Sequence, residues 1–232
     1  MGITSRQSDP GAFGRTQDEL PPLDHGPIDL HTFFGFPTKP NAQRSEASDR
    51  PLELEIGSGK GTFLAQQATR MPGIDYLGIE YARAYYRYAA DRARRNQLDN
   101  VRLLHAEAGL FIRNYVADAT FRQVHLYFPD PWPKKRHHKR RFVQEKNLRE
   151  LHRILVPRDR ADPRAGCIRI ATDHADYFAW MQEHADNVAD LFERLPFDPP
   201  DSAGAGELVG TNFERKYRRE GRGFHGMVLR KR

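Results

Sequence analysis

Short apolar runs alternate with longer amphipathic stretches from residue 52 onward. Runs of this length, closed by glycine, proline or an acid, are typical of buried strands. We predict strands at Leu52–Ile56, Asp75–Ile79, Val101–His105, Gln123–Phe128, Ile168–Ala171 and Gly226–Leu229. We predict helices at about Gly61–Arg70, Ala82–Asn96, Leu110–Val116, Phe142–Leu155 and Tyr177–Leu191. Strands that alternate with helices indicate the α/β class, a mostly parallel sheet with helices on both faces.

The first 50 residues do not share this pattern. They are rich in Pro, Gly, Asp and Ser and have no sustained periodicity, so we predict a disordered extension at residues 1–50 and a domain at residues 51–232. The apolar patch Leu30–Phe36 could dock on that domain, but deleting residues 1–45 is expected to leave the fold intact. Pro157–Gly166 and Asp198–Gly210 are predicted to be surface loops.

Cysteine content and hydropathy narrow the class of protein. Cys167 is the single cysteine, which excludes an internal disulfide and a multi-cysteine zinc site. No apolar run has the roughly 18 residues of a membrane span, and residues 1–15 lack the features of a secretory signal. We therefore expect a soluble cytoplasmic protein.

The charge is basic and clustered. The net charge is +6, and most of the excess lies in residues 134–141 and 215–232. Such clusters favour a polyanionic partner, nucleic acid first among them, although charge alone fits a solvated basic surface equally well.

A glycine-rich turn follows the first predicted strand, directly after Glu55. A P-loop would need Ser or Thr where Gly61 stands, and a dinucleotide-binding turn would need its third glycine at Thr62. The spacing of Gly57, Gly59 and Gly61 after an acid instead resembles the S-adenosylmethionine loop of methyltransferases. In that family Glu55 would face the methionine ammonium, directly or through water.

Two more acids follow the next two predicted strands. Glu80 can accept both hydroxyls of a ribose, although this feature alone does not distinguish S-adenosylmethionine from NAD. Glu107 could accept from an adenine amino group, with the amide of Ala108 facing a ring nitrogen. Each acid alone is compatible with a solvated loop, but acids after three successive strands indicate one cleft.

The fourth predicted strand runs into Phe-Pro-Asp-Pro-Trp, residues 128–132. Proline on both sides of Asp130 restricts the backbone and holds the acid rigidly, as a catalytic group requires. A proline-rich turn that closes the strand is the alternative. Trp132 could stack on a base or be buried.

This segment, followed by Lys134 and His137–Arg141, resembles the tRNA (guanine-N7)-methyltransferase family. Thr172-Asp173 and Thr211–Glu214 match further motifs of that family, and the resemblance covers about residues 52–232. It implies a Rossmann-like class I methyltransferase fold with a mostly parallel seven-stranded sheet. It also implies methyl transfer from S-adenosylmethionine to N7 of a guanosine in the variable loop of tRNA, at position 46.

The resemblance also implies roles for individual residues. Asp130 would be the catalytic acid. The cofactor would be bound by Glu55, Gly57, Gly59, Glu80, Glu107, Ala108 and Asp130. The substrate would be held by Lys134, Asp173, Thr211, Asn212, Phe213 and Glu214. From their charge, RNA phosphates are expected at Lys135, Lys139, Arg140 and Arg141. Aspartate is common at the position of Glu107, so this residue departs slightly from the family pattern.

The chemistry needs little beyond alignment. Guanine N7 has a free in-plane lone pair, so neither a general base nor a metal is required, and Asp130 or Asp173 could hold the N1 and N2 donors of the base. One alternative is a methyltransferase for another RNA, a protein or a small molecule. Another is a non-catalytic RNA-binding protein with a relic fold, against which the intact Glu55, Glu80 and Asp130 argue. We expect a monomer or a homodimer.

Overall fold

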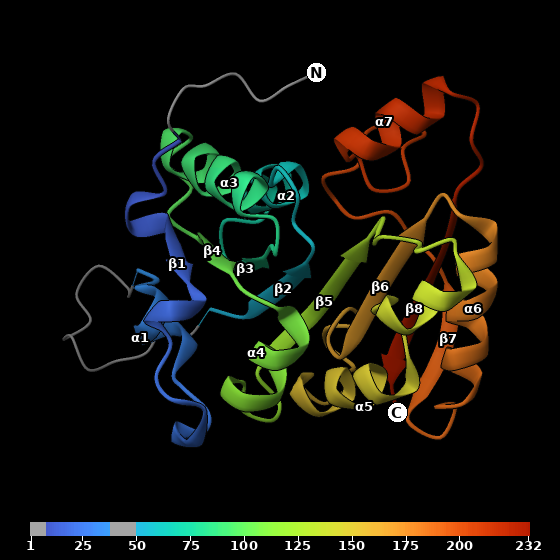
Figure 1. Ribbon diagram of the computed structural model, residues 1–232, viewed down its shortest axis with the longest axis horizontal. Helices are drawn as coiled ribbons and strands as arrows, with labels where there is room; N and C mark the ends of the chain where they lie inside the picture. The colour runs from blue at the N-terminus through green and yellow to red at the C-terminus, as the bar shows by residue number, and fades with distance from the viewer. Residues whose placement is uncertain (1–7, 38–49) are drawn as a thin grey trace.

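The computed structural model describes residues 8–37 and 50–232 and contains one central sheet (Figure 1). Its strands are β1 (Gly14–Thr16), β2 (Leu52–Ile56), β3 (Asp75–Ile79), β4 (Val101–His105), β5 (Phe121–Tyr127), β6 (Cys167–Thr172), β7 (Phe192–Pro196) and β8 (His225–Lys231). They lie in the order β1-β4-β3-β2-β5-β6-β8-β7. Of the described strands, β8 alone runs in the direction opposite to the others. The predicted class I methyltransferase fold is confirmed, but the described sheet has eight strands instead of seven because β1 adds to its edge.

Helices cover both faces of the sheet. The α-helices are α1 (Leu30–Phe34), α2 (Thr62–Arg70), α3 (Arg83–Arg95), α4 (Ala108–Tyr115), α5 (Glu145–Ile154), α6 (Ala175–Asp186) and α7 (Asn212–Arg219). The 3-10 helices are η1 (Gly11–Phe13), η2 (Gln17–Glu19), η3 (Leu23–His25) and η4 (Lys135–Arg140). The larger core lies under α1, α4, α5 and α6, and the smaller core lies under α2 and α3. Within the described ranges, no helix has the length and apolar character to cross a membrane.

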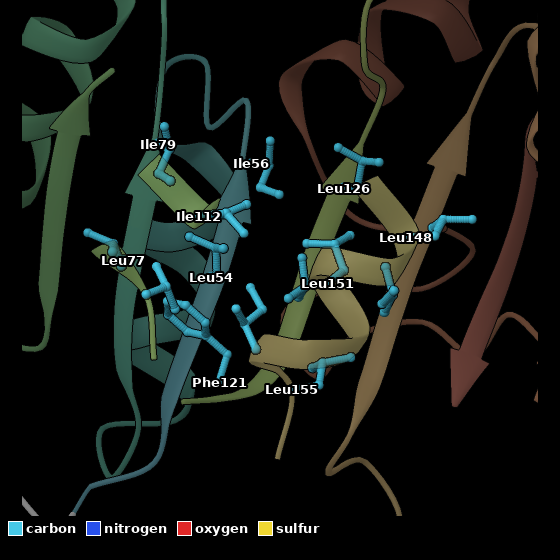
Figure 2. Packing of buried hydrophobic residues seen from close by; sticks show 14 of the residues in the cluster. Leu54, Ile56, Leu77, Ile79, Ile112, Phe121, Leu126, Leu148, Leu151 and Leu155 are labelled. Carbon is cyan, nitrogen blue, oxygen red and sulfur yellow. The ribbon is translucent and has the colours of Figure 1, made fainter. Parts of the chain in front are cut away.

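Strand β2 separates apolar from acidic side chains. Leu54 and Ile56 pack into the larger core with Leu151 of α5 and Ile112 of α4 (Figure 2). Because alternate residues of a strand point to opposite faces, Glu53 and Glu55 face the side of α2. All five residues of β2 are nevertheless buried, so the two carboxylates need partners inside the protein.

Glu53 has such partners on β5. Its carboxylate is ion-paired with Arg122 and accepts hydrogen bonds from Gln123 Nε2 and His125 Nε2, each at 2.9 Å. Burial alone would raise the pKa of Glu53, but the hydrogen bond to His125 and the charge of Arg122 lower it overall. Glu53 is therefore a structural carboxylate, unlike Glu55.

Most predicted helices and strands are confirmed, although several of their bounds differ from the prediction. Leu52–Ile56, Asp75–Ile79 and Val101–His105 have the predicted bounds. Gly226–Leu229 extends to His225–Lys231, and Phe142–Leu155 contracts to Glu145–Ile154 because Gln144 is extended at its N-cap. The helix predicted over Tyr177–Leu191 begins at Ala175 and ends at Asp186, and β7, which follows at Phe192, had not been predicted. Pro157–Gly166 and Asp198–Gly210 contain no helix or strand, as predicted.

Residues 8–37 have a defined structure, contrary to the predicted disordered extension. This segment adds β1 to the sheet and buries Leu30, Phe34 and Phe36 in the larger core. Arg102 of β4 donates a hydrogen bond from Nε to the carbonyl of Phe34 at 2.8 Å. A few well-placed apolar side chains thus anchor a segment whose composition is polar. The rest of the predicted extension, residues 1–7 and 38–49, lies outside the described residues.

Candidate active site

A turn with three glycines connects β2 to α2. Gly57, Gly59 and Gly61 have positive φ angles of 77°, 53° and 64°. A side chain would strain this backbone, and at Gly61 a Cβ atom would lie only 2.9 Å from the Cβ of Ala89. At Gly57 a Cβ would meet no described atom within 4 Å. The turn thus packs against α3 on one side and leaves its backbone open to a ligand on the other.

Glu80 holds this turn from the end of β3. Its Oε2 accepts a hydrogen bond from the amide of Gly59 at 2.7 Å, and its Oε1 accepts one from the amide of Ala82 at 2.7 Å. Each carboxylate oxygen has a further lone pair. Glu80 therefore shapes the glycine turn and keeps acceptor capacity for a pair of hydroxyl groups.

Glu55 is a buried carboxylate with an unpartnered oxygen. Its Oε2 is inaccessible to solvent and has no hydrogen-bond partner among the described residues. Burial, and then the negative charge of Glu80, raise the pKa of Glu55 well above that of an ordinary glutamate. Glu55 lines a cavity of about 190 Å³ together with Gly57, Tyr85, Tyr127, Phe213 and Lys216. A buried acid in this state is suited to receive a cation.

The residues present fit S-adenosylmethionine. This molecule carries an ammonium group, and Glu55 offers an acceptor that would otherwise stay unsatisfied in the protein interior. The hydroxyl of Ser58, in the same cavity wall, also lacks a partner among the described residues. The open backbone at Gly57 leaves room for such a ligand beside Glu55.

Glu107 stands at the end of β4 and caps α4. Its carboxylate accepts hydrogen bonds from the amides of Gly109 at 2.9 Å and Leu110 at 2.6 Å. Ala108 is the first residue of that helix. The amide of Glu80 donates to the carbonyl of Leu104 at 3.0 Å, so the ends of β3 and β4 are joined. The three predicted acids therefore lie at the carboxyl ends of adjacent parallel strands, Glu55 inside β2 and the other two just after β3 and β4.

Asp130 lies in a loop with unusual backbone geometry on both sides. Phe128 and Trp132 have positive φ angles of 52° and 43°, which are rare for residues with side chains. The amide of Phe128 donates to the carbonyl of Ala171 on β6 at 2.7 Å, and this bond anchors the start of the loop. Asp130 itself is exposed. The fold thus presents a carboxylate to solvent on a constrained support.

The buried side chain of Arg141 supports the Asp130 loop. This contradicts the prediction that Arg141 binds an RNA phosphate. The side chain is only 1% exposed, and its Nη2 pairs with Asp176 at 2.5 Å. Its Nε donates to the carbonyl of Pro131 at 2.9 Å, beside Asp130 in sequence. The guanidinium also lies 4.9 Å from the ring centroid of Tyr177. Arg141 is fully engaged in holding the loop, which its place in a basic run did not indicate.

The other basic residues of this run face solvent. Lys134, Lys135, Lys139 and Arg140 are all exposed, in η4 or directly before it. The guanidinium of Arg140 lies 4.9 Å from the ring centroid of Trp132. Trp132 is half-buried and also contacts His137 edge-on, so it packs within the loop.

The two C-terminal motifs occupy different positions. Asp173 follows β6 and accepts a hydrogen bond from Arg222 Nη1 at 2.7 Å. Thr211 and Phe213 both line the cavity, and Phe213 is 42% exposed. Asn212, between them, is the first residue of α7. The Oγ1 of Thr211 caps α7 by accepting from the amide of Glu214 at 3.1 Å.

Glu214 does not face the cavity, contrary to its predicted role in substrate binding. It is fully buried and accepts hydrogen bonds from the amides of Leu208 at 2.5 Å and of Val209 and Gly210 at 2.8 Å. Burial alone would raise its pKa, but these hydrogen bonds and Arg218 lower it. Glu214 shapes the loop that precedes α7. The Thr-x-x-Glu spacing of a helix start was the signal for α7 that our sequence reasoning missed.

Several cavity residues had not been predicted. Lys60, Tyr85, Tyr127 and Lys216 line the cavity but come from four different elements. Of these four residues, only Lys60 could have been identified from the sequence, because it lies inside the glycine turn.

Comparison with known proteins places the chain among methyltransferases. Residues 49–227 match the family model described as a putative methyltransferase. The chain is 37% identical to the tRNA (guanine-N(7)-)-methyltransferase of Alkalilimnicola ehrlichii, over 95% of this chain and 83% of the relative. It is 34% identical to the enzyme of that name from Halorhodospira halophila, over 89% and 81% of the two chains. The corresponding protein of Rhodopirellula baltica is 34% identical over 88% and 74%.

Proposed function

Because the chain belongs to the tRNA (guanine-N7)-methyltransferase family, we propose that it transfers a methyl group from S-adenosylmethionine to N7 of a tRNA guanosine. The variable-loop guanosine at position 46 is the proposed target. One observation carries the proposal: an exposed, rigidly supported Asp130 follows β5, whose residue Tyr127 lines the same cavity as Glu55, and exposed cations follow Asp130 in the chain. A tRNA substrate also implies the cytoplasm.

Each of four acids contacts a different part of the cofactor. Glu55 binds the ammonium group, because its buried Oε2 has no other partner among the described residues. Glu80 accepts from the ribose hydroxyls, and Glu107 accepts from the adenine amino group beside the amide of Ala108. The open backbone at Gly57 lets the ligand approach, and Gly59 completes the turn beside Phe213. Asp130 lies at the end of the site where the methyl group is transferred. When bound, S-adenosylmethionine supplies a methyl group on a positively charged sulfur.

Asp130 acts by electrostatics and alignment. Guanine N7 has a free lone pair, and methylation at this atom would leave a positive charge on the purine. A carboxylate at Asp130 stabilises this charge and can hold the N1 and N2 donors of the base. Asp173 is a second acceptor for the same donors, although Arg222 already occupies one of its oxygens. No proton has to be removed before attack.

The substrate nucleoside is held beside the cofactor. Phe213 and Thr211 form one wall of the cavity, and Lys134 contacts the nucleotide from the Asp130 loop. Lys135, Lys139 and Arg140 bind phosphates and position the RNA without reading its sequence. One chain carries every proposed residue, so a monomer suffices.

The test is direct product analysis. Purified protein is incubated with labelled S-adenosylmethionine and unmodified tRNA, and the digested nucleosides are separated by mass. We expect 7-methylguanosine from tRNA with guanosine at position 46 and none from a matched transcript with adenosine there. Equal labelling of both transcripts would reject the proposed position, and labelling of neither would reject the activity.

A further inference from the structure

The N-terminal segment reaches the adenine end of the proposed cofactor site. Strand β1 pairs with β4 in parallel, with Thr16 opposite His105. The next residue, Gln17, is thereby brought to the loop after β4, where Glu107 lies. The Oε1 of Gln17 accepts a hydrogen bond from the amide of Glu107 at 3.3 Å. Residues 90 positions apart thus meet at the carboxyl edge of the sheet.

The position of Gln17 is held by its own turn. Thr16 and Glu19 form a capping box around η2, with the amide of Thr16 donating to Glu19 Oε1 at 2.8 Å. Glu19 also pairs with Arg15 at 2.9 Å. Burial of Leu30 and Phe34 further along the segment anchors it to the domain. Gln17 is therefore an exposed side chain on a constrained backbone.

The contact with Glu107 determines which way the amide group of Gln17 faces. A backbone N–H can only be received by an oxygen, so Oε1 faces Glu107 and the Nε2 group faces away. No described residue accepts from Nε2, and its two N–H groups remain available as donors. Glu107 itself carries a carboxylate, which caps α4 by accepting from the amides of Gly109 and Leu110 and keeps further lone pairs. The residue that Gln17 contacts through its amide therefore also carries an acceptor.

We propose that Gln17 reads the adenine of the cofactor together with Glu107. Along one edge, adenine presents an amino donor at N6 beside a ring acceptor at N1. The pair of Gln17 and Glu107 offers the complementary donor and acceptor. Hypoxanthine, with an oxygen at position 6 and N1–H, opposes this pattern along that edge. The inference rests on the placement of adenine at Glu107 proposed above.

The experiment measures binding by calorimetry, with S-adenosylhomocysteine and its hypoxanthine analogue S-inosylhomocysteine as probes. Wild-type protein should prefer the adenine compound by about 10-fold or more. Gln17→Ala should weaken the adenine compound by about 3- to 10-fold and leave the hypoxanthine compound almost unchanged. Gln17→Glu keeps an acceptor for the amide of Glu107 but has no donor, so it should lose at least as much adenine preference as Gln17→Ala.

Asp18→Ala is the matched control, since Asp18 is the next residue of η2 and is also exposed. It should bind both probes like the wild type. An unchanged ratio of the two affinities in the Gln17 variants would overturn the inference. So would an equal loss for both probes together with a lower melting temperature of the free protein, which indicates a structural role. Glu55→Gln and Glu80→Ala test the cofactor site separately: if they too bind normally, the proposed site itself is wrong.

Discussion

Glu55 lies near the end of β2 and Glu80 directly after the neighbouring β3, and their carboxylates are in opposite situations. Glu80 accepts two backbone hydrogen bonds at 2.7 Å, whereas Oε2 of Glu55 has no partner among the described residues. The charge of Glu80 adds to burial in raising the pKa of Glu55. The site therefore contains an acid whose ionised form is disfavoured in the free protein, next to one that is already engaged.

Cofactor affinity is predicted to depend on pH through Glu55. Below its raised pKa, Glu55 is protonated in the free protein, and binding of the ammonium group favours the ionised form. Affinity for S-adenosylhomocysteine should therefore rise with pH, by at most about 10-fold per pH unit, until the pKa of Glu55 in the free protein is passed. Calorimetry in two buffers of different ionisation enthalpy would detect the released proton. Glu55→Gln should bind more weakly and lose this slope, while a flat profile for the wild type would contradict the assignment.

Asp130→Ala is predicted to abolish methylation while leaving cofactor binding largely intact. Removing an electrostatic group next to the reacting atoms should lower kcat by about 10²- to 10³-fold. Asp159→Ala, at an exposed acid in the 157–166 loop, serves as the control. Single-turnover rates and the affinity for S-adenosylhomocysteine are the two measurements. Unchanged turnover would remove Asp130 from the mechanism.

Neutralising Lys139 and Arg140 is predicted to weaken tRNA binding without affecting stability. Both side chains are exposed, and each lost phosphate contact should reduce the slope of log affinity against log salt by about 0.7 to 0.9. Filter binding over a range of salt concentrations measures this slope. The phosphate-contact hypothesis fails if the double variant Lys139→Ala/Arg140→Ala keeps the wild-type slope.

Arg141→Ala is predicted to behave differently from its neighbours. Its hydrogen bond to the carbonyl of Pro131 and its packing on Tyr177 are buried, so the variant should lose about 1.5–3 kcal/mol of unfolding free energy. Catalysis should also fall, because the Asp130 loop loses its support. Chemical denaturation separates this variant from Arg140→Ala, which should unfold like the wild type. Equal stability of the two variants would contradict the structural role of Arg141.

Phe34→Ala is predicted to destabilise the whole domain. Phe34 is only 1% exposed and packs in the larger core, so its truncation should cost about 3–5 kcal/mol of unfolding free energy. Phe33→Ala, on the same helix at a half-buried position, should cost less. Denaturation by urea measures both. Wild-type stability of Phe34→Ala would restore the expectation that the first 45 residues are dispensable for folding.

Local sequence alone determined the central architecture. The strands Leu52–Ile56, Asp75–Ile79 and Val101–His105 could be predicted because a few adjacent apolar residues and a closing glycine or acid define a buried strand. The glycine turn and the acids after these strands were likewise visible, since parallel strands bring their carboxyl ends to one edge. The family motifs around Asp130 added the chemistry.

Tertiary structure decided which charged residues serve the site and which serve the fold. Arg141 and Lys139 are two positions apart in one basic run, yet only the first is buried. Glu214 lies in a motif that resembles the family, but its carboxylate accepts hydrogen bonds from three backbone amides. Strand β1, with Gln17 directly after it, comes from a segment of polar composition and pairs with the sheet. The partners of Glu214 are four to six residues away, but Arg141 pairs with Asp176, 35 residues away, and Gln17 contacts Glu107, 90 residues away. The burial of a side chain is set by such distant packing, which the local pattern of polar and apolar residues does not contain.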